Sequence, residues 1–398
     1  MTRSCPTMTL PSSARISARA VRSSRRAFSS APEASCPVDF AANSSIFSRR
    51  YRFQLWLGKG KLLPHKPRMS CKWLALWSLA SLGVLLALGL RFARWKDSRW
   101  ANLLLAGCAA ALTFWALEWS FYFWITPSDG FAMTLSGQRW FQRYWPPLNQ
   151  LGYRDIDHPP SERKKLFVIG DSFVAGHGIN YAGDRFSNLL GERLGNDWEV
   201  FNIAQCGWGT PTEFAALKSH PTKPNAVVWV YFPNDIELSA LLEGKSLPEF
   251  RPLAPLPARK SYLLNFLYWR YARSRMQHVQ TDYWQFINES YKNPTILARQ
   301  IQQLQELVNY SHDQSIALLV VFFPHLPMID WSRKAVEPLR NYFETQHIPT
   351  LDLGERLAGR DLKTLTVNNN DAHARQSLQP ELAAWIEESL RPILSAPH

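Results

Sequence analysis

Residues 166–172 read Leu166-Phe-Val-Ile-Gly-Asp-Ser172, and this stretch decides how the rest of the chain is interpreted. Four consecutive apolar residues, Leu166–Ile169, are typical of a strand buried on both faces. Gly170 ends the apolar run, and a serine follows where the chain must turn. Ligands of α/β folds bind in the crevice at the carboxyl ends of the strands. Ser172 is therefore a candidate nucleophile, although a strand followed by Gly-Asp-Ser is also a common capped turn.

The C-terminal part of the chain alternates strand-like and helix-like segments. Strands are predicted at Leu166–Ile169, Glu199–Ile203, Ala226–Phe232, Ile316–Phe323 and Pro349–Leu353. Helices are predicted at Arg185–Leu194, Pro211–Lys218, Ile296–Tyr310, Arg333–Gln346 and Pro380–Leu390. Apolar strands separated by helices predict a parallel sheet that is covered on both faces.

One region interrupts this alternation. The insert at 237–294 separates the third and fourth predicted strands by far more than an ordinary crossover. It contains several prolines and then an aromatic and basic stretch from Tyr262 to Arg275. Two interpretations stay open: an extra helix that packs its aromatic side chains on the domain, or a lid or surface that faces lipid headgroups or substrate.

Further segments carry residues that suit acyl transfer, which needs a nucleophile, a base, a group that orients the base, and oxyanion donors. Gly207 follows the second strand, and its N–H can donate to an oxyanion. Asn234 follows the third strand, and its amide could donate from the other side. Asp371 and His373 precede the last helix. Asp371 could fix the tautomer of His373, which could accept the proton of Ser172.

Each of these segments also has an ordinary structural explanation, such as a turn, a loop glycine or a helix cap. Their order along the chain, each after a strand or before the last helix, favours one shared site.

Two other histidines are rival bases. His177 lies only five residues after Ser172, and His325 follows the fourth strand without an aspartate in a suitable place. His373 therefore ranks first.

Four blocks of this sequence resemble those of the SGNH/GDSL hydrolase family, over roughly residues 150–395. The blocks are Gly-Asp-Ser172, Gly207, Asn234 and the late Asp371/His373. Asn149–Asp155 is also similar to a segment that precedes the first block in many bacterial, membrane-linked members.

The resemblance implies a three-layer α/β/α sandwich around a parallel sheet, with no metal and no cofactor. It implies that Ser172 is the nucleophile, His373 the base and Asp371 the partner of the base. It also implies an oxyanion hole formed by the N–H groups of Ser172 and Gly207 and the side chain of Asn234.

The last block departs most from the family pattern. Asp371 and His373 are two residues apart where three is commoner, and Ala374-Arg375 follows the histidine where Pro-Asn is common. Pro233 stands where a glycine often precedes the asparagine, which stiffens that loop.

The net charge of +13 lies almost wholly at the N-terminus. Residues 1–68 hold 13 Lys/Arg against Glu33 and Asp39, so the rest of the chain is nearly neutral. The charge therefore indicates no nucleic-acid partner. Residues 1–68 are interpreted as a disordered extension, as a transit peptide around Ala14–Pro32, or as sequence upstream of a true start at Met69, which we favour.

Two apolar segments follow: Trp73–Leu90 without a charge, and Ala101–Ile125 with Glu118 alone. Each is long enough to cross a hydrocarbon core of about 30 Å, and aromatic residues near their ends suit interfacial anchoring. We predict a two-helix transmembrane hairpin at 69–128, followed by the hydrolase domain at 129–398. The alternative is a buried helical hairpin in a soluble domain.

The connection Arg91–Trp100 carries four Lys/Arg and one Asp, and short basic loops stay in the cytoplasm. With a start at Met69, both termini face outward, and the domain lies in the periplasm or outside the cell. A genuine basic tail would weaken this orientation. We therefore expect a two-pass protein of the inner or plasma membrane.

The expected function is ester hydrolysis or O-acyl transfer on an acylated cell-envelope glycan or lipid. Water as acceptor makes an esterase, and a sugar hydroxyl makes an acyltransferase. Membrane lipid is a further expected partner. The alternative from another class is a non-catalytic envelope binding or scaffold protein that keeps the fold. Only Cys206 lies beyond residue 125, so the domain cannot hold an internal disulfide, and no zinc pattern is present.

Overall fold

The computed structural model describes residues 71–92, 99–124, 128–130, 133–248 and 254–395. The chain divides into two compact units, Met1–Arg52 and Phe53–His398, and every described residue belongs to the second. The interpretations of residues 1–68 therefore lie outside the described residues.

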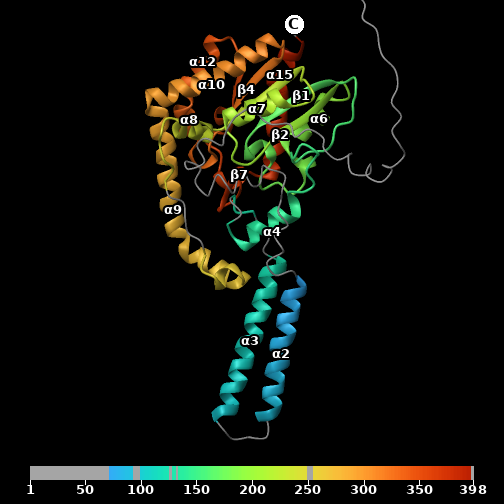
Figure 1. Cartoon of the computed structure of the whole chain (residues 1–398), viewed down its shortest axis with the longest axis vertical. Coiled ribbons are helices and arrows are strands. Elements are labelled where there is room, and N and C mark those ends of the chain that lie inside the picture. Colours follow the sequence, from blue (N-terminus) through green and yellow to red (C-terminus); the bar gives the residue numbers. More distant parts are fainter. Residues whose placement is uncertain (1–70, 93–98, 125–127, 131–132, 249–253, 396–398) are drawn as a thin grey trace, which may run out of the picture. The chain divides into compact units, whose positions relative to one another are not determined.

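A five-stranded parallel sheet forms the centre of the second unit, with the strand order β2-β1-β3-β4-β5 (Figure 1). The strands are β1 Lys164–Gly170, β2 Trp198–Ala204, β3 Ala226–Tyr231, β4 Ala317–Phe322 and β5 Thr350–Asp352. The first and last residues of each strand lie within two residues of the boundaries that the sequence predicts. The α/β class with a parallel sheet is confirmed.

Apolar residues gather on both faces of this sheet. Along β3, Val228 and Val230 join one apolar cluster, while Val227 and Trp229 join the other. The first face is covered by α6 Phe186–Leu194 and α15 Gln379–Ser395. The second is covered by α7 Thr210–Ser219, α10 Pro294–Asp313 and α12 Glu337–Thr345. The described helices thus give the three layers that the family resemblance implies.

Two predicted elements differ in the structure. The helix predicted at Arg333–Gln346 is two helices, α11 Ile329–Ala335 and α12, because Pro338 fits only the first turn of a helix and forces a new start. The segment of Asp371 and His373, for which no strand was predicted, forms the strand β7 Asp371–Ala374, which pairs antiparallel with β6 Thr366–Asn368. Such short strands show too few residues for a period of two to be recognised.

Shorter helices connect these elements. They are α4 Leu135–Tyr144, α5 Ser172–Ala175, α8 Ile236–Leu242, α13 Leu353–Leu357 and α14 Leu362–Leu365.

The two apolar segments form the helices α2 Cys71–Phe92 and α3 Arg99–Trp124, which contact each other. Trp119 Nε1 on α3 donates to Ser78 Oγ on α2 at 3.1 Å. Leucines such as Leu79 and Leu105 are about two-thirds exposed, at 67% and 70%. A search of the described residues finds no helix that is both long and apolar enough to cross a membrane.

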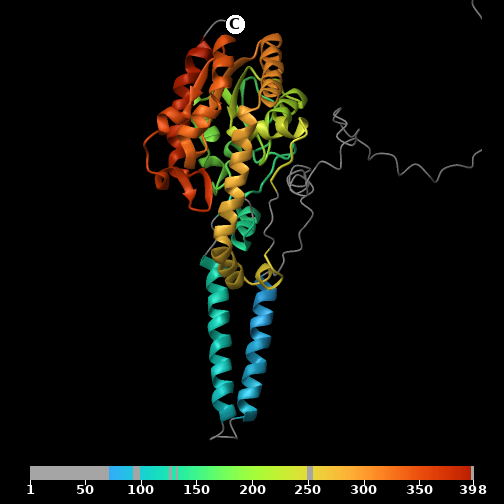
Figure 2. The ribbon, with the colours of Figure 1, turned by 90° about the vertical axis from the view of Figure 1, so that its left-hand side faces the viewer.

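The insert at 237–294 consists mainly of the 31-residue helix α9 Tyr262–Lys292 (Figure 2). Glu118 of α3, which is 1% exposed, accepts hydrogen bonds from the first N–H groups of α9, at 2.6 Å from Tyr262 and 3.0 Å from Leu263. The single charge of the second apolar segment therefore caps this helix. At the other end, Ile287 and Tyr291 join the apolar cluster on the sheet. The insert therefore contains a long helix whose C-terminal end packs on the sheet, while Tyr271 in its N-terminal half is 82% exposed.

Candidate active site

The candidate nucleophile stands at the carboxyl end of the central strand β1. Gly170 ends the strand, and a Cβ there would lie 2.6 Å from Val174 Cγ2 and 3.0 Å from the Val230 carbonyl oxygen. Only glycine lets the chain turn this tightly between neighbouring elements. Asp171 then caps α5, since its carboxylate accepts from the Phe173 N–H at 2.9 Å. Ser172 is the first residue of that helix. It therefore lies at the carboxyl end of the strand, where the sequence analysis placed the ligand crevice.

Ser172, His373 and Asp371 form a continuous hydrogen-bonded chain. Ser172 Oγ lies 2.7 Å from His373 Nε2, and His373 Nδ1 lies 2.6 Å from Asp371 Oδ1. Because the carboxylate only accepts, it holds the proton on Nδ1 and leaves Nε2 to accept from the serine. The backbone N–H of His373 donates to the same Asp371 oxygen at 3.1 Å. The structure thus brings together three residues that the sequence predicts as a triad.

Asp371 is ionised although it is only 1% exposed. Burial opposes the charge, but the charge of His373 and its hydrogen bond outweigh burial and hold the pKa of Asp371 well below its usual range. A carboxylate in this state can orient the imidazole and stabilise the imidazolium that forms when the serine is deprotonated.

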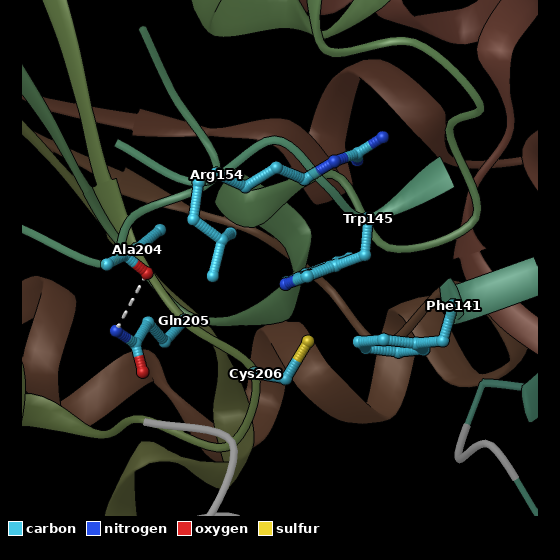
Figure 3. A pocket seen from close by; sticks show the side chains of 8 residues that line it. Phe141, Trp145, Arg154, Ala204, Gln205 and Cys206 are labelled. Atoms are coloured by element: carbon cyan, nitrogen blue, oxygen red, sulfur yellow. Dashed lines mark hydrogen bonds between the residues drawn. The ribbon is translucent and has the colours of Figure 1, made fainter. Parts of the chain in front are cut away.

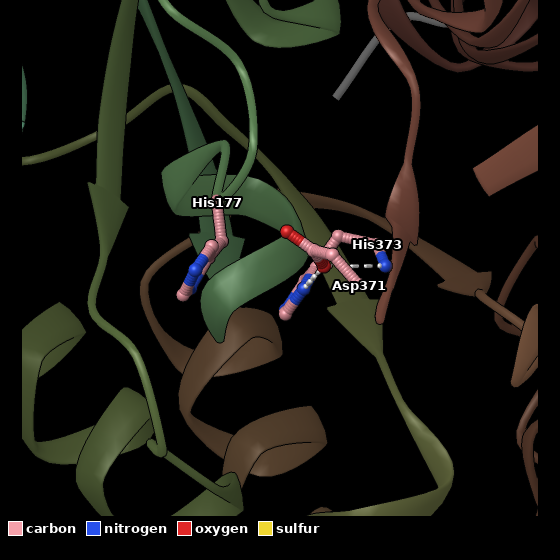
Figure 4. Close-up of side chains that lie close together, drawn as sticks. All are labelled: His177, Asp371 and His373. Carbon is pink, nitrogen blue, oxygen red and sulfur yellow. Dashed lines mark hydrogen bonds and ion pairs between the residues drawn. The ribbon is translucent and has the colours of Figure 1, made fainter. Parts of the chain in front are cut away.

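The two rival histidines lie near the site but do not bond to Ser172 in the described part of the chain. Burial, followed by the charge of His373, lowers the pKa of both His177 and His325 to about 3. The ring of His177 stacks on that of His373, with centroids 4.5 Å apart and an interplanar angle of 10° (Figure 4). His325 stacks on Trp284 at 3.9 Å. Both therefore pack around the site as neutral rings.

Trp140 of α4 completes this stack, because its ring lies parallel to that of His177 at 5.2 Å. Trp140 is 2% exposed, and its Nε1 donates to Asn180 Oδ1 at 2.9 Å. The tryptophan, His177 and His373 therefore form three parallel layers that restrict the orientation of the candidate base. No sequence signal identified Trp140, because its contact with His177 joins residues 37 apart.

His177, Asp371 and His373 offer possible metal-ligand atoms that lie within 4.8 Å of one another. Both ring nitrogens of His373 already bond, one to Ser172 and one to Asp371. A metal ion bound through His373 would have to replace one of these hydrogen bonds. The present geometry therefore fits a catalytic triad better than a metal centre.

The candidate oxyanion donors lie in two neighbouring loops. Gly207 has a φ of +78° in the turn closed by the 3.3 Å bond from the Trp208 N–H to the Gln205 carbonyl, a conformation that favours glycine. Its own N–H has no acceptor among the described residues. The side chain of Asn234 likewise makes no hydrogen bond to them, and its Oδ1 is buried. Both groups are thus available to a ligand.

Contacts from distant segments hold these loops. A Cβ at Gly209 would lie 3.3 Å from the Asp235 carbonyl oxygen, so the Gly207 and Asn234 loops pack closely. On the α9 side, Tyr291 Oη donates to the Pro233 carbonyl at 2.9 Å and lies 2.8 Å from Tyr231 Oη. The insert helix therefore fixes the loop that carries Asn234.

Arg154 supports the loop that follows the candidate nucleophile. Its guanidinium donates to the carbonyls of Tyr144 at 2.8 Å, Gly176 at 2.7 Å and Ile179 at 2.7 Å. The residue is 2% exposed, and burial together with Arg185 lowers its pKa to about 9. This gives a structural role to the segment Asn149–Asp155, which the sequence singled out only through the family resemblance.

Three buried carboxyl groups near Ser172 were not anticipated. Asp171, Glu213 and Asp235 are each at most 1% exposed. Burial raises the pKa of all three, and their mutual charges raise those of Glu213 and Asp235 further. Neither carboxyl oxygen of Glu213 has a partner among the described residues. We therefore treat Glu213 as a neutral, protonated side chain.

No protein-family model matches the sequence, and no curated protein matches it either. Among solved structures, "Crystal Structure of TesA" is similar at 17% identity, covering 58% of this chain and 99% of the other, with a TM-score of 0.37. A putative G-D-S-L lipolytic protein from Desulfitobacterium hafniense follows at 15% identity, with coverages of 57% and 100% and a TM-score of 0.37. A carbohydrate acetylesterase family member from Sinorhizobium meliloti is similar at 15% identity, with coverages of 58% and 100% and a TM-score of 0.36. At these scores the likeness carries no argument, and the function is argued from the site.

Proposed function

We propose that this chain is a serine ester hydrolase or O-acyltransferase of the SGNH/GDSL type. The observation that carries the proposal is the chain of short contacts from Asp371 through His373 to Ser172, at 2.6 and 2.7 Å. The ordered blocks of the sequence and the left-handed turn at Gly207, which packs closely on the loop of Asn234, support the same chemistry.

The first half of the reaction forms an acyl-enzyme. Ser172 Oγ attacks the acyl carbon while His373 Nε2 takes its proton, and Asp371 stabilises the resulting imidazolium without becoming protonated. The carbonyl oxygen becomes an oxyanion that accepts from the Gly207 N–H and the Asn234 amide. The bond from the acyl carbon to the alcohol oxygen then breaks, and His373 returns its proton to the leaving alcohol.

The second half releases the acyl group. Water or a sugar hydroxyl attacks the acyl carbon while His373 accepts the proton of the nucleophile. Collapse of the second oxyanion breaks the bond to Ser172 Oγ, which recovers its proton from His373. Water yields a carboxylic acid, and a sugar hydroxyl yields a new ester. The two activities differ only in the acceptor.

The test uses the full chain in detergent, a chromogenic acetyl ester and a fluorophosphonate probe. Ser172→Ala and His373→Ala should each lower turnover by about 10³-fold or more. The probe should label the wild type and not Ser172→Ala. Ser219→Ala serves as the matched control, because Ser219 is an exposed serine on α7. A wild-type chain that neither labels nor turns over ester would favour the scaffold alternative.

A sugar acceptor separates the two activities. The acyl ester and an acceptor glycan are incubated with the protein, and mass spectrometry follows the acylated glycan and the free acid. Accumulation of acylated glycan that depends on Ser172 supports transfer. Free acid alone supports hydrolysis.

The substrate class and the location complete the proposal: an acylated envelope glycan or lipid, met by an outward-facing domain at the inner or plasma membrane. The exposed leucines of α2 and α3 and the basic connection between these helices support a membrane position. Alkaline phosphatase fused after His398 should be active in cells. Activity of only a cytoplasmic reporter at that position would refute the orientation.

A further inference from the structure

The pocket shown in Figure 3 is too small to hold a glycan or a lipid chain. It lies beside Arg154 and Cys206, and its free volume of about 20 Å³ has room for about one water molecule. A more extended surface lies on the N-terminal half of α9, over residues 262–272, where the exposed side chains are mostly apolar.

The exposed side chains of this half of α9 share one side of the helix. Leu264, Leu267 and Tyr271 are exposed and follow one another at intervals of three and four residues, which places them on one face. Phe266 and Arg270, which are also exposed, adjoin them; these five residues are called the α9 face below. A surface helix normally turns polar side chains to water, and a contiguous apolar patch marks an interaction site.

The opposite side of the helix holds it to the domain. Asn265, Trp269 and Ala272 are buried there, and the last two share a small apolar cluster with Ala258. The side chain of Asn265 accepts from the Leu135 N–H at 3.0 Å and donates to the Ala258 carbonyl at 2.8 Å. The α9 face is therefore not needed to attach the helix to its own domain.

The chain around the α9 face is basic. Residues 250–281 contain six Lys/Arg and no Asp/Glu. Among the described side chains, Lys260 and Arg270 are exposed. Leucine and aromatic side chains combined with Lys/Arg are typical of a helix that lies in the interface of an anionic membrane. The charge and the apolar side chains thus favour the same partner.

The α9 face also adjoins the exposed apolar helices. The rings of Phe121 on α3 and Phe266 on α9 have centroids 4.6 Å apart, and those of Tyr122 and Tyr262 are 5.2 Å apart. Glu118 of α3 caps the start of the same helix. One lipid surface can therefore contact both the end of α3 and the α9 face.

We propose that the α9 face lies on the surface of an anionic membrane. Leu264, Leu267 and Tyr271 enter the boundary between headgroups and acyl chains, and Lys260 and Arg270 meet the lipid phosphates. This inference rests on the membrane position within the proposed function and does not depend on the ester chemistry. It adds a second lipid contact to that of α2 and α3.

The test places the photoreactive residue p-benzoylphenylalanine at position 267 of the full chain. Leu242 on α8 is the matched control position, because the two leucines are similarly exposed, at 50% for Leu267 and 54% for Leu242. Each protein is reconstituted with vesicles of phosphatidylglycerol and phosphatidylcholine and irradiated, and mass spectrometry identifies the adducts. Position 267 should give lipid adducts, and position 242 should give far fewer.

The failures of this inference and of the membrane position are distinguishable. A chain that does not associate with the vesicles would refute both. A chain that associates but gives no more lipid adduct at position 267 than at position 242 would overturn this inference alone. Adducts of position 267 with protein, either a second copy or another segment of this chain, would overturn it as well.

A charge variant tests the contact with the headgroups. In the protein with the photoreactive residue at position 267, Arg270→Gln should lower the yield of phosphatidylglycerol adducts by about fivefold, the effect of one basic residue at an anionic surface. Lys245→Gln is the matched control, because Lys245 is an exposed lysine beyond α8, and it should leave the yield unchanged. An unchanged yield in Arg270→Gln would overturn the assignment of the face to anionic lipid.

Discussion

Asp371 and Glu213 are equally buried, at 1% and 0% exposed, yet the pKa of one is lowered and that of the other is raised. Asp371 bonds to an imidazole at 2.6 Å, while both oxygens of Glu213 lack partners among the described residues. Burial alone thus favours the neutral acid, and one well-placed imidazole reverses its effect. The same comparison extends to Asp235, which lies beside the proposed donor Asn234 and also has a raised pKa.

The difference suits the proposed chemistry. A negative charge at Asp371 stabilises the imidazolium that forms at His373. A negative charge at Glu213 or Asp235 would lie close to the loops of Gly207 and Asn234, where it would repel the developing oxyanion. Neutral carboxyls behind these loops therefore leave the donor groups effective.

The largest expected effect appears when each of the two carboxyl groups is replaced by the amide of the same shape and the activities of the two variants are compared. Asp371→Asn should lower kcat on an acetyl ester by about 10⁴-fold, because the amide stabilises the wrong imidazole tautomer. Glu213→Gln should stay within a few-fold of the wild type, because a neutral amide replaces a neutral acid of the same shape. Steady-state kinetics of both variants measure this, with thermal unfolding to verify the fold. Similar losses in the two variants would contradict the assigned charge states.

A smaller effect is expected in the pH dependence of stability. The folded-state pKa of Glu213 lies above its unfolded value. The contribution of Glu213 to the free energy of unfolding is therefore fully present below about pH 4.3, and it is lost as the pH rises toward the folded-state pKa. One retained proton gives a slope of up to about 1.4 kcal/mol per pH unit. In urea unfolding between pH 5 and 8, the free energy of unfolding of Glu213→Gln should therefore fall less steeply with pH than that of the wild type. An identical decline in both proteins would show that Glu213 is already ionised.

The smallest effect concerns the rival base. His325 is neutral above about pH 3, so His325→Gln should lower kcat/KM by less than tenfold and leave the loss of activity at acidic pH in place. His325→Gln keeps a planar polar side chain against Trp284. A pH–rate profile of this variant tests the assignment. Disappearance of the acidic limb would identify His325, rather than His373, as the base.

Local patterns were sufficient to predict the sheet and the candidate triad. Buried parallel strands appear as continuous apolar runs, and all five were predicted within two residues. Ser172 and His373 follow from strand ends and chain order. The break between α11 and α12 was also accessible, because Pro338 marks it in the sequence.

The surroundings of the site could not be predicted, because their contacts join residues far apart along the chain. The hydrogen bond from Tyr291 to Pro233 spans 58 residues, and that from the Tyr262 N–H to Glu118 spans 144. No periodicity reports such pairs. The neutral state of Glu213 depends likewise on complete burial, which only the packed fold defines.

The short strand β7 divides the assembly of the site into a local and a global step. Asp371 and His373 are two residues apart, so their bond forms wherever this strand forms. The contact of His373 with Ser172 closes a loop of 201 residues and requires the sheet and the last helices to be in place. Covalent labelling at Ser172 would therefore count fully folded molecules, and partly unfolded chains that keep the aspartate–histidine pair would stay unlabelled.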